Sequence, residues 1–213
     1  MEIFNEFVNF VKVIVYISFL NSILFLDKKK LINKWLIVIV SVCFFTEIFN
    51  SLLVVLKVSL GFFNTISIIF HNLFWIILLS LIFKFKIQKI WFSIYLFICL
   101  INILFIQGFQ KFNTYTFLFS AIIYLVILIS KNINILRLEK LDIFKTNKYL
   151  LSLSPILFFI GLGLMFSFKS KTLVNLQIFN EIKLYTFINY FVNTIYYALI
   201  NIYIFKERKL QNA

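Results

Sequence analysis

Glycine, proline and cysteine are scarce in this chain of 213 residues, which has 4 glycines, 1 proline and 2 cysteines. So few glycines and prolines exclude a collagen-like or low-complexity disordered chain, and two cysteines exclude a disulfide scaffold. Charge is scarce as well: charged residues make up 14% of the chain, whereas a soluble domain has roughly 25%. The chain therefore lacks the polar surface that a water-soluble domain needs.

Hydrophobic residues are abundant instead, at 62% of the chain, with 20% aromatic residues and a mean hydropathy of +1.01. A soluble domain of this length can bury only part of its apolar surface, so the sequence predicts a polytopic membrane protein. Hydrocarbon offers backbone groups no partners, and no alternating barrel pattern is visible. We therefore expect an all-α bundle in a single domain, residues 1–213.

Seven stretches approach the roughly 20 apolar residues that a helix needs to cross a bilayer core. They are residues 7–26, 35–56, 62–83, 90–106, 114–130, 149–168 and 184–205. The fourth and fifth are the shortest, so a six-span protein in which this pair forms a re-entrant hairpin is the alternative. The longest connection, residues 131–148, is predicted to be a basic loop, with an interfacial helix as the alternative.

Basic residues are concentrated in alternate connections. One alternating set, with the tail, holds 15 Lys and Arg residues, and the opposite set holds 5. This bias predicts that the basic connections are cytoplasmic, with the N-terminus outside and the C-terminus in the cytoplasm. The net charge of +13 is then expected to attract anionic lipid rather than nucleic acid. Lys12, inside the first span, is expected to extend its ammonium outward to the interface.

Polar residues inside the predicted spans are the main indicator of function, since each must be solvated by protein or water. Glu47 is the only acid well inside a span, and Asn50 shares its helical face. His71, the only histidine, lies beside Asn72 in the next span at a similar depth, about 14 Å from the outer end at 1.5 Å per residue. We therefore expect Glu47 to contact His71. This contact is either a proton-responsive switch, since histidine titrates near neutral pH, or a clamp between two helices.

The last predicted span carries a polar stripe. Thr186, Asn189, Asn193, Tyr197 and Asn201 recur every three or four residues and so share one helical face. Such a stripe either lines a pocket for a ligand or water that opens outward, or supplies hydrogen bonds between helices. The sequence has no P-loop, HExxH or CxxC motif, and neither a cofactor nor a metal is expected.

Four segments suggest a family: residues 45–51 of the second span, 69–73 of the third, 112–115 at the start of the fifth and 188–197 of the last. With the order of the spans, they resemble a group of uncharacterised seven-helix inner-membrane proteins common in Bacteroidetes-type bacteria. The resemblance implies the topology given above and no activity. That group often carries an acid after the histidine of span three and another early in span five. This chain has Phe74, Trp75, Ala121 and Ile122 there.

Short connections, a basic cytoplasmic face and the lack of catalytic motifs favour a non-enzymatic membrane module. We expect it to sense or to scaffold through a membrane or cytoplasmic protein partner. The alternative is a small transporter or channel whose polar path runs through Glu47, His71 and the last span. An enzyme acting on lipid is disfavoured, because these two residues lie too deep to reach a headgroup. The sequence does not indicate the ligand, the partner or the oligomeric state.

Overall fold

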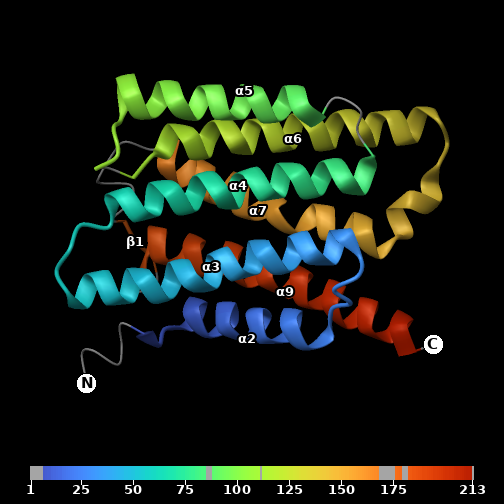
Figure 1. The fold of residues 1–213 in the computed structure, drawn as a ribbon, viewed down its shortest axis with the longest axis horizontal. Coiled ribbons are helices and arrows are strands. Elements are labelled where there is room, and N and C mark those ends of the chain that lie inside the picture. The colour runs from blue at the N-terminus through green and yellow to red at the C-terminus, as the bar shows by residue number, and fades with distance from the viewer. Residues whose placement is uncertain (1–6, 85–87, 111, 168–175, 179–181, 213) are drawn as a thin grey trace.

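The computed structural model describes residues 7–84, 88–110, 112–167, 176–178 and 182–212. These residues form a bundle of α-helices whose axes are roughly aligned, with consecutive helices running in opposite directions (Figure 1). The helices are α2 (Phe10–Phe25), α3 (Leu31–Val55), α4 (Gly61–Phe83), α5 (Gln88–Ile101), α6 (Thr114–Arg137), α7 (Asn147–Ser167) and α9 (Leu184–Asn212). A π-helical turn, η1 (Asn102–Ile106), continues α5, and a 3-10 turn, η2 (Leu141–Lys145), precedes α7. Strands β1 (Gln177–Ile178) and β2 (Ile182–Lys183) form an antiparallel pair before α9.

The predicted helical fold is confirmed, because each apolar stretch overlaps one described helix. Four of these helices, α3, α4, α6 and α7, are long and apolar enough to cross a membrane. Helix α2 and the apolar segment Ile90–Ile106 are shorter. Helix α9 has 29 residues, but its asparagines and tyrosines make it less apolar than the other long helices. The structure is thus compatible with a membrane protein.

Helix α6 is longer than the hydropathy of its sequence indicates. It continues to Arg137, so the first part of the predicted basic loop at 131–148 is helical. No glycine or proline interrupts this segment, and the chain leaves the helix at Glu139, which has a positive φ of 52°. Helices α5 and α6 lie side by side and antiparallel along most of their lengths (Figure 1). Helix α5 has 14 residues and is shorter than the four helices that are long enough to cross a membrane, so the choice between a seven-span protein and a re-entrant pair stays a prediction.

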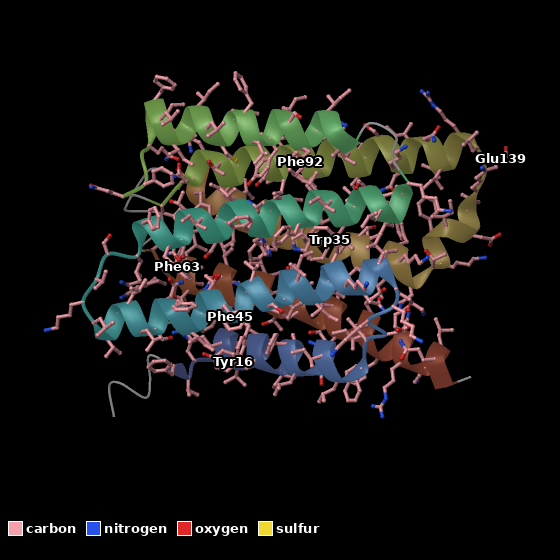
Figure 2. The ribbon with its side chains drawn as sticks, viewed as in Figure 1. Tyr16, Trp35, Phe45, Phe63, Phe92 and Glu139 are labelled. Atoms are coloured by element: carbon pink, nitrogen blue, oxygen red, sulfur yellow. The ribbon has the colours of Figure 1, made fainter. Side chains whose placement is uncertain are left out.

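Six helices form a closed ring. In order around the ring they are α2, α3, α4, α6, α7 and α9, and α9 packs back against α2. Helix α5 lies outside the ring, against α4 and α6 (Figure 1). The outer surface of the bundle is apolar: Phe45 on α3, labelled in Figure 2, is 51% exposed, and Phe105 in η1 is 80% exposed. Such a surface suits contact with lipid better than contact with water.

The two ends of the bundle differ in charge. Consecutive helices are antiparallel, so the α2–α3 and α6–α7 connections, the end of α4, the start of α5 and the last turns of α9 gather at one end (Figure 1, right). We call it the basic end, because these are the segments in which Lys and Arg are concentrated. The opposite end is where α2 and α9 begin and the α3–α4 connection lies. We call it the open end, because a cavity lies inside the bundle near it.

Candidate functional site

A cavity of about 310 Å³ lies inside the ring, in the half of the bundle nearest the open end. All six ring helices contribute side chains to its wall. The lining residues are Val11, Val42, Cys43, Thr46, Glu47, Asn50, Asn64, Ser67, Ile68, His71, Asn72, Phe112, Phe117, Phe158, Leu162, Phe166, Tyr185, Asn189, Asn193 and Tyr197. The structure therefore brings most of the suggested site residues around one space, and the exceptions are Thr186 and Asn201 of the polar stripe, which do not line it.

The cavity is closed towards the basic end. On α9 the lining runs from Tyr185 to Tyr197, which corresponds to a depth of about 18 Å at 1.5 Å per residue. Below that level the ring is filled by side chains with no solvent exposure, including Leu36 of α3, Leu78 of α4 and Ile200 of α9. Close packing of this kind leaves no room for a continuous polar path. The cavity is a one-ended vestibule.

The floor of the cavity is a chain of hydrogen bonds across three helices. Trp75 Nε1 donates to Tyr196 Oη at 2.8 Å, and this hydroxyl lies 3.1 Å from His71 Nε2. His71 Nδ1 is 3.0 Å from Asn72 Oδ1, and Asn72 Nδ2 donates to the Ser120 hydroxyl at 2.6 Å. Ser120 in turn donates to the carbonyl oxygen of Phe117. The chain links α9, α4 and α6.

This order of donors and acceptors determines the state of His71. Asn72 Oδ1 only accepts, so His71 Nδ1 carries the proton, and Nε2 is the acceptor for the Tyr196 hydroxyl. Trp75 Nε1, which can only donate, also lies 3.3 Å from His71 Nε2, so Nε2 carries no proton and the imidazole is neutral in this arrangement. The expected direct contact with Glu47 is not formed: both ring nitrogens bind other side chains, and Glu47 shares only the cavity with His71. Equal depth in neighbouring helices did not bring the two groups together, because Tyr196 and Asn72 are nearer partners.

The upper wall of the cavity has polar atoms without protein partners. The oxygen Oδ1 of Asn50 is buried and has no hydrogen-bond partner. For the carboxylate of Glu47, no hydrogen bond is found within the described part of the chain. Lys12 attracts this carboxylate electrostatically, and its ammonium donates to the hydroxyl of Ser51 at 2.9 Å. Lys12 is 7% exposed, so the expectation that it reaches outward to an interface is wrong: it has a partner inside the bundle.

The polar stripe of α9 has two roles. Its half near the open end lines the cavity, and its other half forms hydrogen bonds with another helix. Asn189, Asn193 and Tyr197 line the cavity, with Asn193 Nδ2 donating to Asn189 Oδ1 at 2.9 Å. Asn201, below the cavity, instead joins two helices: its amide donates to Ser18 Oγ, and its carbonyl accepts from Asn21 of α2. The outer half of the stripe is therefore a cavity wall and the inner half is a set of interhelical hydrogen bonds.

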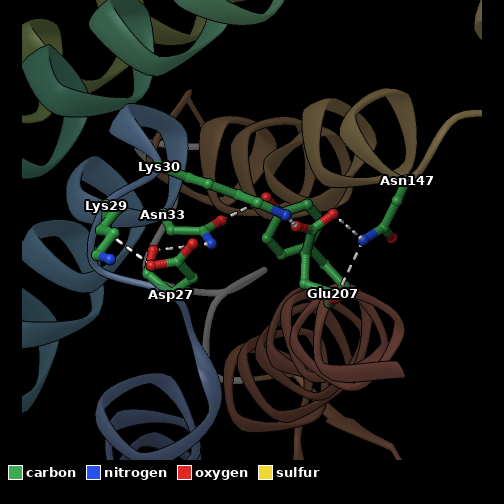
Figure 3. Close-up of polar contacts among 7 residues, drawn as sticks. Asp27, Lys29, Lys30, Asn33, Asn147 and Glu207 are labelled. Carbon is green, nitrogen blue, oxygen red and sulfur yellow. Dashed lines mark hydrogen bonds and ion pairs between the residues drawn. The ribbon is translucent and has the colours of Figure 1, made fainter. Parts of the chain in front are cut away.

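A second polar cluster holds the last turns of α9 at the basic end (Figure 3). Glu207 accepts from Lys30 Nζ at 2.9 Å and from Asn147 Nδ2 at 3.1 Å. One turn earlier on α9, Tyr203 donates to Asn33 Oδ1 at 2.7 Å. These bonds tie α9 to the α2–α3 connection, to α3 and to the start of α7. The sequence does not indicate this cluster, because its members have the pattern of ordinary interfacial residues and only the fold brings them together.

No known protein family, curated protein or solved structure matches this chain. Among the described residues, no group of three His, Cys, Asp or Glu side chains could hold a metal ion. The geometry of the cavity is thus the main basis for assigning a function.

The hydrogen-bond chain predicts which residues are energetically coupled. We expect His71→Leu and Tyr196→Phe to show a coupling energy of at least about 0.5 kcal/mol, because the two side chains share a hydrogen bond. Glu47→Gln and His71→Leu should add to within about 0.5 kcal/mol, since they have separate partners. Unfolding in detergent of both sets of single and double variants measures this. Coupling of Glu47 with His71, and none of His71 with Tyr196, would show that the assigned partners are wrong.

Proposed function

We propose that the chain is a non-enzymatic sensing module of a bacterial inner membrane, in which a small ligand enters the cavity and α9 transmits its presence. In this proposal all seven described α-helices cross the bilayer. The open end faces outward and the basic end faces the cytoplasm, where a membrane or cytoplasmic protein partner receives the signal. The positive-inside bias supports this orientation.

The observation that carries the proposal is the one-ended cavity. A channel needs a path that is open at both ends. A transporter opens to one side at a time, and it usually builds its site from broken helices, whereas α3, α4 and α9 are continuous beside this cavity. Here the cavity stops at the hydrogen-bond chain of Trp75, Tyr196 and His71, and close-packed residues such as Leu78 and Ile200 fill the ring beyond. A receptor needs only one entrance, so this shape favours sensing over the alternative of transport through Glu47, His71 and α9.

Helix α9 connects the cavity to the basic end. Its first half supplies Asn189, Asn193 and Tyr197 to the cavity wall, and its last turns carry Tyr203 and Glu207 of the basic-end cluster. Tyr197 and Glu207 are ten residues apart, which is about 15 Å along a helix at 1.5 Å per residue. A helix transmits a shift over this distance as a rigid element. A change at the wall therefore reaches the contacts with Lys30 and Asn147.

A side chain that fills the cavity tests the coupling without knowledge of the ligand. Ser67→Phe introduces a ring into the cavity from α4, and we expect the end of α9 to move by about 1–2 Å, as packed helices do in switching proteins. Nitroxide labels at Lys29→Cys and Lys209→Cys report this distance in nanodiscs, in a Cys43→Ala, Cys99→Ala background. Both label sites are exposed.

The matched control is Ser93→Phe, which makes the same change on the exposed face of α5, outside the ring. It should leave the distance between the labels unchanged. An unchanged distance in Ser67→Phe as well would refute transmission along α9. Proton or solute flux into liposomes that requires Glu47 would instead establish the transporter alternative.

A further inference from the structure

A second, apolar groove lies between α3 and α4 on the outside of the ring. Its walls carry phenylalanines from both helices, and Phe49 and Phe63 pack against each other with ring centroids 5.3 Å apart. Figure 2 labels Phe45 and Phe63, which lie on the two sides of this groove towards the open end. On α3 the groove extends from Val38 to Phe49, which is about 16 Å at 1.5 Å per residue.

The groove and the cavity meet at a thin wall. Val42 and Thr46 of α3 and Ser67 of α4 line both spaces. All three side chains are small, and Glu47, the only acidic residue among the described residues that line the cavity, follows Thr46 directly in the sequence. A molecule lying across this wall would place one end in the polar cavity and the other in the apolar groove.

The groove accepts only an apolar occupant. Its hydroxyl groups on α3 are already used within the helix, because Ser41 donates to the carbonyl of Ile37 and Thr46 to that of Val42. The remaining lining is almost entirely aliphatic and aromatic, apart from Ser67. A polar group placed there would lose its hydrogen bonds with water and gain none. A hydrocarbon chain is the occupant that this surface can stabilise.

The cavity side of the wall favours a cationic head with hydrogen-bond donors. The carboxylate of Glu47 and the unpartnered oxygen of Asn50 both accept hydrogen bonds, and no Lys or Arg is among the described residues that line the cavity. Lys12 attracts Glu47, but its own ammonium is bonded to Ser51 and does not line the cavity. Phe158 and Phe166 add aromatic faces, which attract organic cations.

We infer that the ligand is a single-chain amphiphile with a protonated amine head, held with its head beside Glu47 and its chain between α3 and α4. This inference rests on the proposed sensing function and specifies its ligand. It also gives the ligand a route, since an amphiphile dissolved in the bilayer can enter sideways between the two helices. Entry from water through the open end is then unnecessary.

Photo-crosslinking of the full chain in phosphatidylcholine nanodiscs tests the inference, with dodecylamine carrying a diazirine on its chain as the probe. We expect adducts concentrated on residues 38–49 and 63–70, and competition by unlabelled dodecylamine. Dodecanol, which lacks the charge, should compete at least about tenfold less well, as expected for loss of a hydrogen bond between charged groups. Dodecanoate and butylamine, which lack the cationic head or the long chain, should not compete.

Two variants test the binding of the amine head and of the hydrocarbon chain separately. Glu47→Gln keeps the shape of the side chain and should weaken competition by dodecylamine about tenfold, because the charge is lost. Ser41→Trp fills the groove alone and should abolish the adducts. Ser130→Trp, the same change at an exposed position on α6, should not affect them. Retained thermal stability of Glu47→Gln shows that its effect is not a failure to fold.

Adducts spread evenly over the outer surface, including α5, would mean partition into bulk lipid and would overturn the inference. If dodecanol competes as well as dodecylamine, the inference that the ligand has a cationic head is wrong. If crosslinking fails while Ser67→Phe still moves α9, the ligand class is wrong and the sensing function stands. If dodecylamine binds as expected but does not move α9, the amphiphile site stands and the sensing function fails.

Discussion

Replacing Gly161 with alanine is expected to lower the free energy of unfolding by about 1–3 kcal/mol, the usual cost of overpacking a core. A Cβ atom at Gly161 of α7 would clash with Cγ1 of Val192 on α9. Val192 is 3% exposed, and a β-branched side chain in a helix has little freedom to turn away. The helices α7 and α9 therefore have to separate. Equilibrium unfolding in mixed micelles measures the loss.

Gly163 provides the matched control two residues further along α7. A Cβ atom there would meet only Leu118 Cδ2, at 3.6 Å, which is an ordinary van der Waals contact. Gly163→Ala should be neutral or stabilising, because alanine is favoured over glycine in a helix by roughly 0.5–1 kcal/mol. Val192→Ala should restore part of the stability of Gly161→Ala. Equal losses at the two glycines would refute the close approach at Gly161.

Replacing Glu207 with leucine is expected to destabilise the protein by about 1.5–3 kcal/mol, the range for hydrogen bonds to a charged group. Glu207 is 5% exposed, and it joins Lys30 and Asn147 to α9. We expect the lower part of this range, because the side chain of Lys30 is 47% exposed and water can solvate its ammonium after the change. In the protein labelled at residues 29 and 209, the distribution of distances between the two nitroxides should broaden, because the end of α9 loses its contacts.

The exposed ion pair of Asp142 with Lys145 is the control for this change. Its side chains are 96% and 82% exposed, so Asp142→Leu should alter neither stability nor the distance between the labels. If Asp142→Leu and Glu207→Leu have the same small effect, then burial of Glu207 contributes nothing to holding α9. The stability of Glu207→Leu should be measured by the same equilibrium unfolding in mixed micelles as Gly161→Ala, so that the two losses of stability can be compared directly.

Hydrophobic runs were sufficient to predict the helices, because runs of about 20 apolar residues are much longer than a strand and match a helix. Helix α7 forms even though Pro155 and two glycines lie within it. The cavity wall on α9 could be predicted as well. Asn189, Asn193 and Tyr197 are spaced so that any packing that turns one of them inward turns all of them inward. Asn50, Glu47 and His71 lie in the neighbouring helices α3 and α4, and the fold brings them to the same space.

The partners of those residues could not be predicted, because they depend on the order of helices around the ring. His71 bonds to Tyr196, which is 125 residues away in the sequence and looks like any other aromatic residue of a membrane helix. Gly161 could be interpreted from sequence only as a flexible point, whereas its contact with Val192 makes it a site of close approach. Lys12 is buried because the bundle supplies Ser51 as a partner.

The position of α5 outside the ring determines the directions in which the ring helices run. If the six ring helices followed one another directly, they would alternate in direction, and the first would begin at the same end at which the last one finishes. The detour through α5 reverses the direction once, so that α4 and α6 are parallel neighbours, as are α9 and α2 (Figure 1). As a result, α9 starts at the mouth of the vestibule and finishes at the opposite face of the bundle. The excluded helix thus places the two ends of α9 on opposite faces of the bundle, one beside the cavity and the other in the basic-end cluster.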